Sequence, residues 1–469
     1  MKKTFLITIL SFASQIIIAQ NITGQWTGTL NVQGTKLRLI FNIVETDNKL
    51  SSTIDSPDQA AKGIPCNQTI FTEGKLTISI ESLMANYEGT LDGDTLKGTF
   101  SQSGIKFPLN LTKNTSNISN TKPNRPQEPR LPFPYRTEEV VFQNKVDGNT
   151  LAGTLTIPSP KGKYPVVLLI SGSGAQNRDE EIFDHKPFAV IADYLTRNGI
   201  GVLRYDDRGT ASSTGNFATA TTLDLSRDAE AGVAYLLTRS DVDSRKIGLI
   251  GHSEGGIIAP MVAVRNHNVA FIVMLAGTGI TGDQILLKQT DDIAKLLGTP
   301  ENIRQSNLKV KEQLYRIVKN TDINEKLRTD ITALLEESLN NKYIASIQNL
   351  TNEQRNNLIQ RAIDEITSPW IRYFIAYDPA PTLGKVKCPV LALNGELDSQ
   401  VSAKVNLHAI RTALESGGNK QVTTIELPGL NHMFQECQTG APSEYIQIEQ
   451  TFSPKALEEI GKWIKKQTK

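Results

Sequence analysis

The segment from Gly251 to Gly255, which reads Gly-His-Ser-Glu-Gly, has the residue types and spacing of a nucleophilic serine site. In the pattern G-x-S-x-G, a sharp turn between a strand and a helix exposes the serine hydroxyl above the sheet. Apolar residues 247–250 predict the strand, and residues 255 to about 264 predict the helix. Side chains at positions 251 and 255 would collide with the backbone of such a turn. The helix N-terminus also favours negative charge beside the serine oxygen, so we predict that Ser253 is a nucleophile.

A serine hydroxyl needs a base to take its proton and a carboxylate to orient that base. In hydrolases with this turn, the chain order is serine, acid, histidine. The chain has five histidines, and two of them follow the resumption of apolar strands near residue 389. His408 falls inside an expected amphipathic helix, whereas His432 follows an expected strand at residues 422–427, where open α/β sheets form active sites. We predict His432 as the base and expect His252 to pack around the turn.

Two carboxylates compete for the role of the acid. Glu396 and Asp398 both follow an apolar strand at residues 389–393. Asp398 precedes His432 by 34 residues, which leaves room for one helix, one strand and a loop. We favour Asp398, in part because of the family pattern given below, and expect Glu396 to be a solvated turn residue.

A serine hydrolase also needs two backbone N–H groups aimed at the negative charge that develops on the substrate oxygen. One is expected from Glu254, the residue after the nucleophile. The other is expected from the loop at residues 171–174, where small residues let the backbone approach a carbonyl. We assign Ser173 to this oxyanion hole, with Gly174 as the alternative.

All of these residues depend on a sheet to bring them together. Residues 164–170 are continuously apolar, as expected of a central strand that is covered on both faces. From there to residue 275 strands and helices alternate, which predicts a parallel, doubly wound α/β sheet. Residues 280 to about 375 are polar and helical in rhythm, so we expect a helical cap over the site before the sheet resumes at residues 389–393.

Residues 20–112 indicate a separate all-β domain, with about seven or eight short strands in a small barrel or sandwich. This part has no histidine, so a metal or acid–base site is not expected in it. Three roles fit such a domain: packing on the catalytic domain, assembly into a homo-oligomer, and presentation of a ligand. Residues 113–134 are rich in Pro, Asn and Ser and predict an extended, solvated linker to a catalytic domain at residues 135–469.

Residues 1–19 have the pattern of a cleaved signal peptide, because Lys2 and Lys3 precede an apolar stretch that polar residues interrupt. We therefore expect an exported protein, periplasmic or secreted, without stable membrane insertion.

The net charge of +1, from 50 basic and 49 acidic residues, argues against a nucleic-acid partner. Three cysteines are too few for a disulfide scaffold, although a bridge between Cys388 and Cys437 stays open.

Six motifs occur in an order that resembles a family of bacterial α/β-hydrolases, the serine aminopeptidase-like acyl carboxylesterases. They are LISGSGAQNRDEE at 169–181, RYDDRG at 204–209, GHSEGG at 251–256, SPWIRYF at 368–374, LNGELDSQV at 393–401 and LNHMFQ at 430–435. Members have an α/β-hydrolase fold with a helical cap, and several carry an extra N-terminal β domain. The sequence departs from the family pattern at Ser171, where relatives often have histidine, and at residues 210–213.

The resemblance covers residues 136–468 and implies that Ser253, Asp398 and His432 form the catalytic triad of a carboxylesterase for short acyl esters. The expected substrate is a small-molecule ester, cleaved through an acyl-enzyme without a metal or other cofactor. A peptidase of the aminopeptidase type and an acyl-carbohydrate esterase would use the same triad. A binding protein without activity would keep only the fold.

Three further sets of residues are candidates for a place in the site or for structural support. Trp370, Tyr373 and Phe374, at the end of the expected cap, either line a substrate pocket or pack the cap on the core. Residues 206–208, Asp-Asp-Arg, are expected to form a structural ion pair that shapes their loop. Residues 178–181, Arg-Asp-Glu-Glu, either line the cleft or form a solvated rim.

Overall fold

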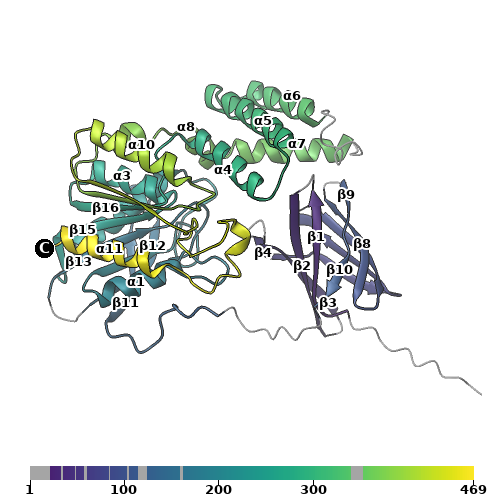
Figure 1. The fold of residues 1–469 in the computed structure, drawn as a ribbon, viewed down its shortest axis with the longest axis horizontal. Coiled ribbons are helices and arrows are strands. Elements are labelled where there is room, and N and C mark those ends of the chain that lie inside the picture. Colours follow the sequence, from purple (N-terminus) through teal and green to yellow (C-terminus); the bar gives the residue numbers. More distant parts are fainter. Residues whose placement is uncertain are drawn as a thin grey trace, which may run out of the picture.

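The computed structural model describes residues 22–32, 35–47, 49–57, 61–83, 85–102, 105–114, 124–158, 162–339 and 352–469. The expected signal peptide and residues 115–123 of the expected linker lie outside the described residues. Within these ranges, no helix combines the length and the apolar character that crossing a membrane requires. Figure 1 shows the N-terminal β domain beside the α/β domain, with the cap helices extending in this view from the α/β domain over the β domain.

The N-terminal domain is a single antiparallel sheet that packs around its own core. Its described residues form ten strands in the order β4-β3-β2-β1-β10-β8-β7-β6-β5, with β9 paired to β8. Alternate residues of each strand face inward, as in β6, and they surround the buried Trp26, Phe41 and Tyr87. The strands are β1 (Gly24–Val32), β2 (Thr35–Thr46), β3 (Lys49–Ser56), β4 (Ala61–Pro65), β5 (Gln68–Thr72), β6 (Lys75–Ile80), β7 (Ala85–Asp92), β8 (Thr95–Gln102), β9 (Ile105–Pro108) and β10 (Leu111–Lys113).

The expected seven or eight strands are too few. The strands β9 and β10 have only four and three residues, which is too short to show an alternating pattern in the sequence. Because all ten strands belong to one sheet, the barrel-like alternative describes the domain and the two-sheet sandwich does not.

The second domain is built on an eight-stranded sheet with the order β11-β12-β14-β13-β15-β16-β17-β18. The pairings β11–β12 and β12–β14 are antiparallel, and all the others are parallel. This is the α/β-hydrolase fold that the sequence predicted. The strands are β11 (Arg136–Gln143), β12 (Thr150–Ile157), β13 (Tyr164–Ile170), β14 (Gly201–Tyr205), β15 (Val242–His252), β16 (Val269–Leu275), β17 (Val390–Gly395) and β18 (Val422–Leu427).

Helices cover both faces of this sheet (Figure 1). Side chains of α1 (Pro187–Arg197) and α11 (Pro454–Gln467) share one core with Val167 and Leu169 of β13. Side chains of α2 (Thr222–Leu237), α3 (Gly255–Arg265) and α10 (Ala403–Ser416) share the other core with the alternate residues of β13. Burial on both faces explains the continuous apolar run of this strand.

In the described part of the expected cap, every regular element is a helix. It consists of α4 (Gly282–Leu296), α5 (Glu301–Asn320), α6 (Glu325–Leu339), α7 (Asn352–Ile366) and α8 (Pro369–Ala376), followed by the short α9 (Ala380–Leu383). Tyr315, Val318 and Ile331 belong to a core within the cap. A second cluster joins the cap to the sheet domain, because Ile285 and Phe374 pack against residues of α3.

The expectation of a solvated linker is wrong for residues 124–128. The Arg125 side chain is buried and donates hydrogen bonds to the carbonyl oxygens of Phe183 (2.8 Å), Ile446 (3.1 Å) and Ile448 (2.8 Å). Gln127 accepts hydrogen bonds from the N–H groups of residues 451 and 452 and donates one to the carbonyl oxygen of Phe452. This segment therefore belongs to the catalytic domain.

Candidate active site

Ser253 lies in a strained turn between β15 and α3. Its φ of +51° is in the left-handed region, which costs a non-glycine residue about 1–3 kcal/mol. A Cβ added to Gly251 would lie 1.9 Å from the carbonyl oxygen of Gly255, and one added to Gly255 would lie 2.2 Å from that of Ile170. The prediction that side chains at these two positions would collide with the backbone is confirmed.

His432 and Asp398 lie in the loops that follow β18 and β17, at the same edge of the sheet as Ser253. His432 Nδ1 is 2.8 Å from Asp398 Oδ2, and both side chains are buried. The other oxygen of Asp398 accepts hydrogen bonds from the backbone N–H groups of Gln400 and Val401, both at 2.8 Å. A carboxylate accepts only, so Nδ1 carries the proton and Nε2 keeps its lone pair, as a general base requires.

The competing carboxylate, Glu396, has a different role. Its side chain is exposed and accepts a hydrogen bond of 3.0 Å from the backbone N–H of Gly429, at the start of the loop that carries His432. His408 lies on α10, as expected, and does not line the cavity beside Ser253.

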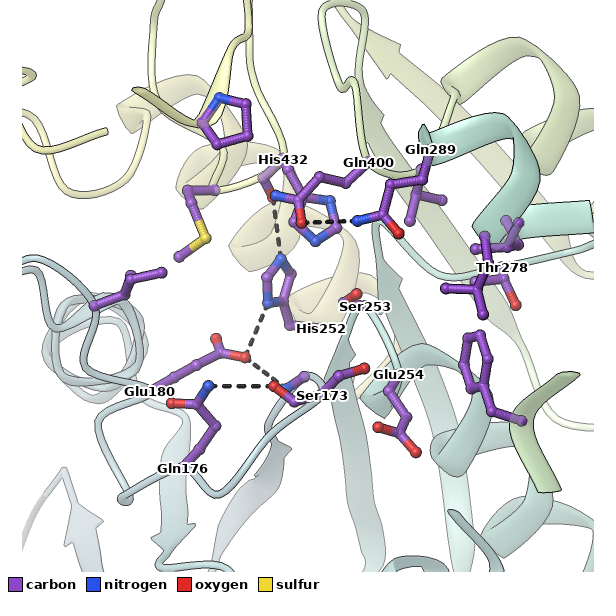
Figure 2. A pocket seen from close by; sticks show the side chains of 18 of the residues that line it. Ser173, Gln176, Glu180, His252, Ser253, Glu254, Thr278, Gln289, Gln400 and His432 are labelled. Atoms are coloured by element: carbon purple, nitrogen blue, oxygen red, sulfur yellow. Dashed lines mark hydrogen bonds and ion pairs between the residues drawn. The ribbon is translucent and has the colours of Figure 1, made fainter. Parts of the chain in front are cut away.

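A cavity of about 420 Å³ lies between the sheet edge and the cap, and Ser253, Glu254 and His432 line it (Figure 2). Its apolar lining comes mainly from the cap residues Ile285, Leu286, Ile293, Trp370 and Phe374, together with Val401. Tyr373 is not a lining residue and stacks instead on Tyr377, with ring centroids 5.8 Å apart, so its assignment to the pocket is wrong.

The polar lining includes three glutamines from three separate elements. Gln289 of α4 donates a 3.3 Å hydrogen bond to Gln400, and Gln400 donates one of 2.9 Å to the hydroxyl of Tyr445. Gln176 donates one of 3.4 Å to the carbonyl oxygen of Ser173. None of the described lining residues is Lys or Arg, so the cavity offers no fixed cation to an anionic substrate.

Ser173 lies in the cavity wall, as the oxyanion-hole assignment requires, whereas the alternative, Gly174, is not a lining residue. The loop around Ser173 is held by Asp207, which accepts hydrogen bonds from the Ser171 hydroxyl and the Gln176 N–H, both at 2.9 Å. Burial raises the pKa of Asp207 to about 8. Asp207 is a residue whose role the sequence did not reveal.

The charge cluster at residues 206–208 is structural for two of its three members. Asp206 pairs with Arg178 at 2.8 Å, and Arg208 pairs with Asp228 at 2.6 Å. The expected ion pairing is therefore present, but with partners outside the cluster. Asp207 between them has the separate role of holding the oxyanion loop.

Of the four residues at 178–181, one lines the cavity and another lies on the exposed rim. Glu180 is buried and lines the cavity, whereas Glu181 is exposed. Arg178 and Asp179 are used in ion pairs, the latter with Arg204.

The side chain of Glu254 connects the nucleophile turn to the cap. Its Oε1 accepts hydrogen bonds from the Thr222 hydroxyl at 2.6 Å and from the indole N–H of Trp370 at 2.8 Å. Its Oε2 is buried as well, and burial raises the pKa of this carboxyl.

Comparison with known proteins identifies the family. The sequence model of the X-Pro dipeptidyl-peptidase (S15) family matches residues 147–417, which is more than half of the chain. The chain belongs to the S15 family. S15 proteins are serine hydrolases, so this S15 member is an enzyme of the serine hydrolase class.

This S15 protein is also similar to proteins that are named as esterases. It is 25% identical to the esterase EstD of Thermotoga maritima over 333 residues, which are 71% of this chain and 69% of that protein. Among solved structures, an esterase of Pyrococcus furiosus matches 71% of this chain and 91% of its own, with 14% identity and a TM-score of 0.43. Est1E of Butyrivibrio proteoclasticus, solved with ferulic acid, matches 70% and 96%, with 15% identity and a TM-score of 0.39.

The three cysteines are not paired. Cys66, Cys388 and Cys437 are all free thiols, so the bridge between the last two, left open by the sequence, is not formed.

Proposed function

We propose that this chain is a carboxylesterase in which Ser253, Asp398 and His432 form the catalytic triad. The observation that carries the proposal is the 2.8 Å contact between His432 Nδ1 and Asp398 Oδ2, at a cavity that Ser253 also lines. Loops after β15, β17 and β18 supply the three side chains to one sheet edge, where α/β sheets form active sites.

In the proposed reaction, Ser253 Oγ attacks the ester carbonyl carbon while His432 Nε2 takes the hydroxyl proton. Asp398 stabilises the imidazolium that results. The backbone N–H groups of Glu254 and Ser173 stabilise the oxyanion. His432 then gives its proton to the leaving alcohol, and an acyl-enzyme remains. A water molecule, deprotonated by His432, attacks the acyl carbon, and Ser253 leaves with the proton as the acid is released.

The cavity supports a short acyl group and a neutral alcohol. Its volume of about 420 Å³ is at the small end of ligand sites, and the cap supplies apolar side chains such as Ile285 and Phe374 to its wall. The three glutamines on the polar side are amide groups that can bind hydroxyls, so an acylated carbohydrate is one alcohol class that fits them.

A peptidase is the second candidate function, because the matching family is named for X-Pro dipeptidyl-peptidase. Such an enzyme must bind the charged terminus of a peptide. Among the described lining residues, the acidic groups are Glu180 and Glu254, and Glu180 is already hydrogen-bonded to His252. A peptide amine would therefore have Glu254 as its carboxylate partner.

The test uses a fluorophosphonate probe and a substrate panel. We expect the probe to label the purified chain but not Ser253→Ala. The control is Ser244→Ala, which changes an exposed serine of β15, the strand before the nucleophile turn, and which should still be labelled. Hydrolysis of p-nitrophenyl acetate and butyrate above that of the decanoate, and above aminoacyl and X-Pro anilides, supports the esterase. Labelling of Ser253→Ala overturns the assignment of the nucleophile, and faster cleavage of the anilides supports the peptidase instead.

A further inference from the structure

The buried side chain of His252 lies between two oxygen atoms that belong to other parts of the site (Figure 2). Its Nδ1 is 2.9 Å from Glu180 Oε1, and its Nε2 is 3.0 Å from the backbone carbonyl oxygen of His432. The same Glu180 oxygen accepts a hydrogen bond of 2.6 Å from the N–H of Gly172, in the expected oxyanion loop. One short chain of contacts thus joins the oxyanion loop, the nucleophile turn and the loop of the base.

The partners of His252 determine its protonation. A carbonyl oxygen only accepts hydrogen bonds, so Nε2 must carry a proton to make its contact with His432. The carboxylate of Glu180, stabilised by the Gly172 N–H, also accepts, so Nδ1 must carry a proton as well. With protons on both nitrogens, the ring is an imidazolium. Burial alone would lower the pKa of His252, but Glu180, the carbonyl oxygen of His432 and Asp398 together outweigh burial, and the net direction of the pKa is upward.

We propose that His252 and Glu180 form a buried ion pair that positions the catalytic base and the oxyanion loop and keeps a permanent positive charge beside His432. This inference rests on the proposed function of Ser253, Asp398 and His432. In it His252 and Glu180 are positioning residues, because their contacts are with other protein groups and not with the reacting atoms.

The backbone at Glu180 supports a positioning role. This residue has a φ of +50°, a left-handed conformation that non-glycine residues seldom adopt. The side chain of Glu180 is also buried, so its carboxylate needs the cationic ring for compensation. The strained residue and the buried charge are both accounted for by the contact with His252.

The charge of His252 has a consequence for catalysis. The ring centroids of His252 and His432 are 4.8 Å apart. Three groups face His252 from the elements around it: Glu180 after β13, Asp398 after β17, and His432 after β18. The positive charge of His252 therefore lies directly beside the ring that acts as the base.

The test compares Glu180→Gln and His252→Gln with Glu181→Gln, in which the neighbouring, exposed glutamate is changed. A glutamine at 180 keeps the size of the side chain and can still accept from the N–H of Gly172. The same oxygen cannot also donate to a neutral His252, so the contact with His252 is lost together with the charge. We measure kcat and KM for p-nitrophenyl acetate from pH 5 to 9. For both site variants we expect kcat to fall by about 10- to 100-fold with little change in KM.

The second measurement does not depend on activity. Proton–nitrogen NMR of the histidine rings at pH 8, assigned through the loss of signals in His252→Gln, is expected to find protons on both nitrogens of His252 in the unmodified chain. A single ring proton overturns the ion pair. A kcat in His252→Gln or Glu180→Gln that stays within twofold of the Glu181→Gln control overturns the catalytic part. If Ser253→Ala retains esterase activity, the proposed function fails, while the NMR result on His252 still stands or falls by itself.

Discussion

Ser171 Oγ donates a hydrogen bond of 2.9 Å to Asp207 Oδ1, and this contact joins the loops that follow the adjacent strands β13 and β14. The second oxygen of Asp207 accepts the Gln176 N–H at 2.9 Å, so one buried carboxyl group holds residues on both sides of Ser173. Ser171 is thus part of the support of the oxyanion loop.

The first prediction concerns this support. Asp207→Ala removes both acceptors, and we expect kcat/KM to fall by roughly 10²-fold, as for the loss of an oxyanion donor. Asp207→Asn is expected to stay within about threefold of the unmodified chain, because an amide can accept from Gln176 and donate to Ser171. Kinetics with p-nitrophenyl acetate check both variants. An unaffected Asp207→Ala would show that the loop does not need this carboxyl.

The second prediction separates the two competing acids. Asp398→Asn is expected to lower kcat by about 10⁴-fold, because the amide no longer holds His432 in the right tautomer. The fold should persist, since the N–H groups of Gln400 and Val401 can still bind the side-chain oxygen. Glu396→Gln is the matched control and should retain its activity. Equal losses in the two variants would contradict the assignment of Asp398.

The third prediction concerns the contact between the cap and the nucleophile turn. Trp370→Phe keeps the stacking on Phe374, with centroids 5.0 Å apart, but removes the hydrogen bond to Glu254. We expect KM to rise several-fold and the free energy of unfolding to fall by about 1 kcal/mol. Trp463→Phe, which removes a 3.4 Å indole hydrogen bond on α11, is the control and should not change KM. A KM that stays constant in Trp370→Phe would mean that this contact does not shape the pocket.

The fourth prediction is a pH dependence of stability. Burial lowers the pKa of His185 to about 4, against about 6.5 in an unfolded chain. Between these values the unfolded chain binds a proton that the folded chain does not. The free energy of unfolding therefore falls as the pH falls, by up to about 1.4 kcal/mol per pH unit. Urea unfolding at pH 7.5 and 5 measures the slope. His185→Gln is expected to have a smaller slope, whereas the exposed His267→Gln should keep it.

The fifth prediction concerns the anchored linker. Arg125→Ala leaves the carbonyl oxygens of Phe183, Ile446 and Ile448 without their shared donor, and we expect a loss of about 2–4 kcal/mol in the free energy of unfolding. Because Ile182 and Tyr445 line the cavity next to these carbonyls, activity should fall as well. Arg130→Ala, at an exposed position six residues before residue 136, should be silent in both assays. If Arg125→Ala is as stable and as active as the unmodified chain, residues 124–128 do not support the catalytic domain, and the prediction is wrong.

The sequence was sufficient for the main features of the fold, and the structure brings together the residues that it singled out. Strand periodicity, the glycines of the turn and the order of Ser253, Asp398 and His432 are local signals, and each follows from a steric or chemical requirement of one segment. The two-face burial of the sheet likewise follows from runs such as residues 164–170.

The supporting residues could not be predicted, because their partners are distant in the sequence. Asp206 and Asp207 are adjacent acids, yet one pairs with Arg178 and the other holds Ser171, depending only on the side of the strand end from which each side chain leaves. His252 was expected to pack around the turn because nothing nearby in the sequence marks Glu180 as its partner, 72 residues away. Trp370 and Tyr373 are both aromatic residues of α8, and which of them lines the cavity depends on the direction of its side chain, which a sequence does not state.

The hydrogen bonds of Arg125 to three backbone carbonyl oxygens, here called the Arg125 clamp, determine where the catalytic domain can be joined to a different N-terminal domain. Residues 124–128 are bound to the catalytic domain. A different N-terminal domain can therefore be joined to this catalytic domain without removing these contacts only if the junction lies before Asn124. The clamp binds backbone carbonyl oxygens at residues 446 and 448 and not their side chains. The side chains of that loop can therefore change under selection for new substrates while the clamp is inherited intact.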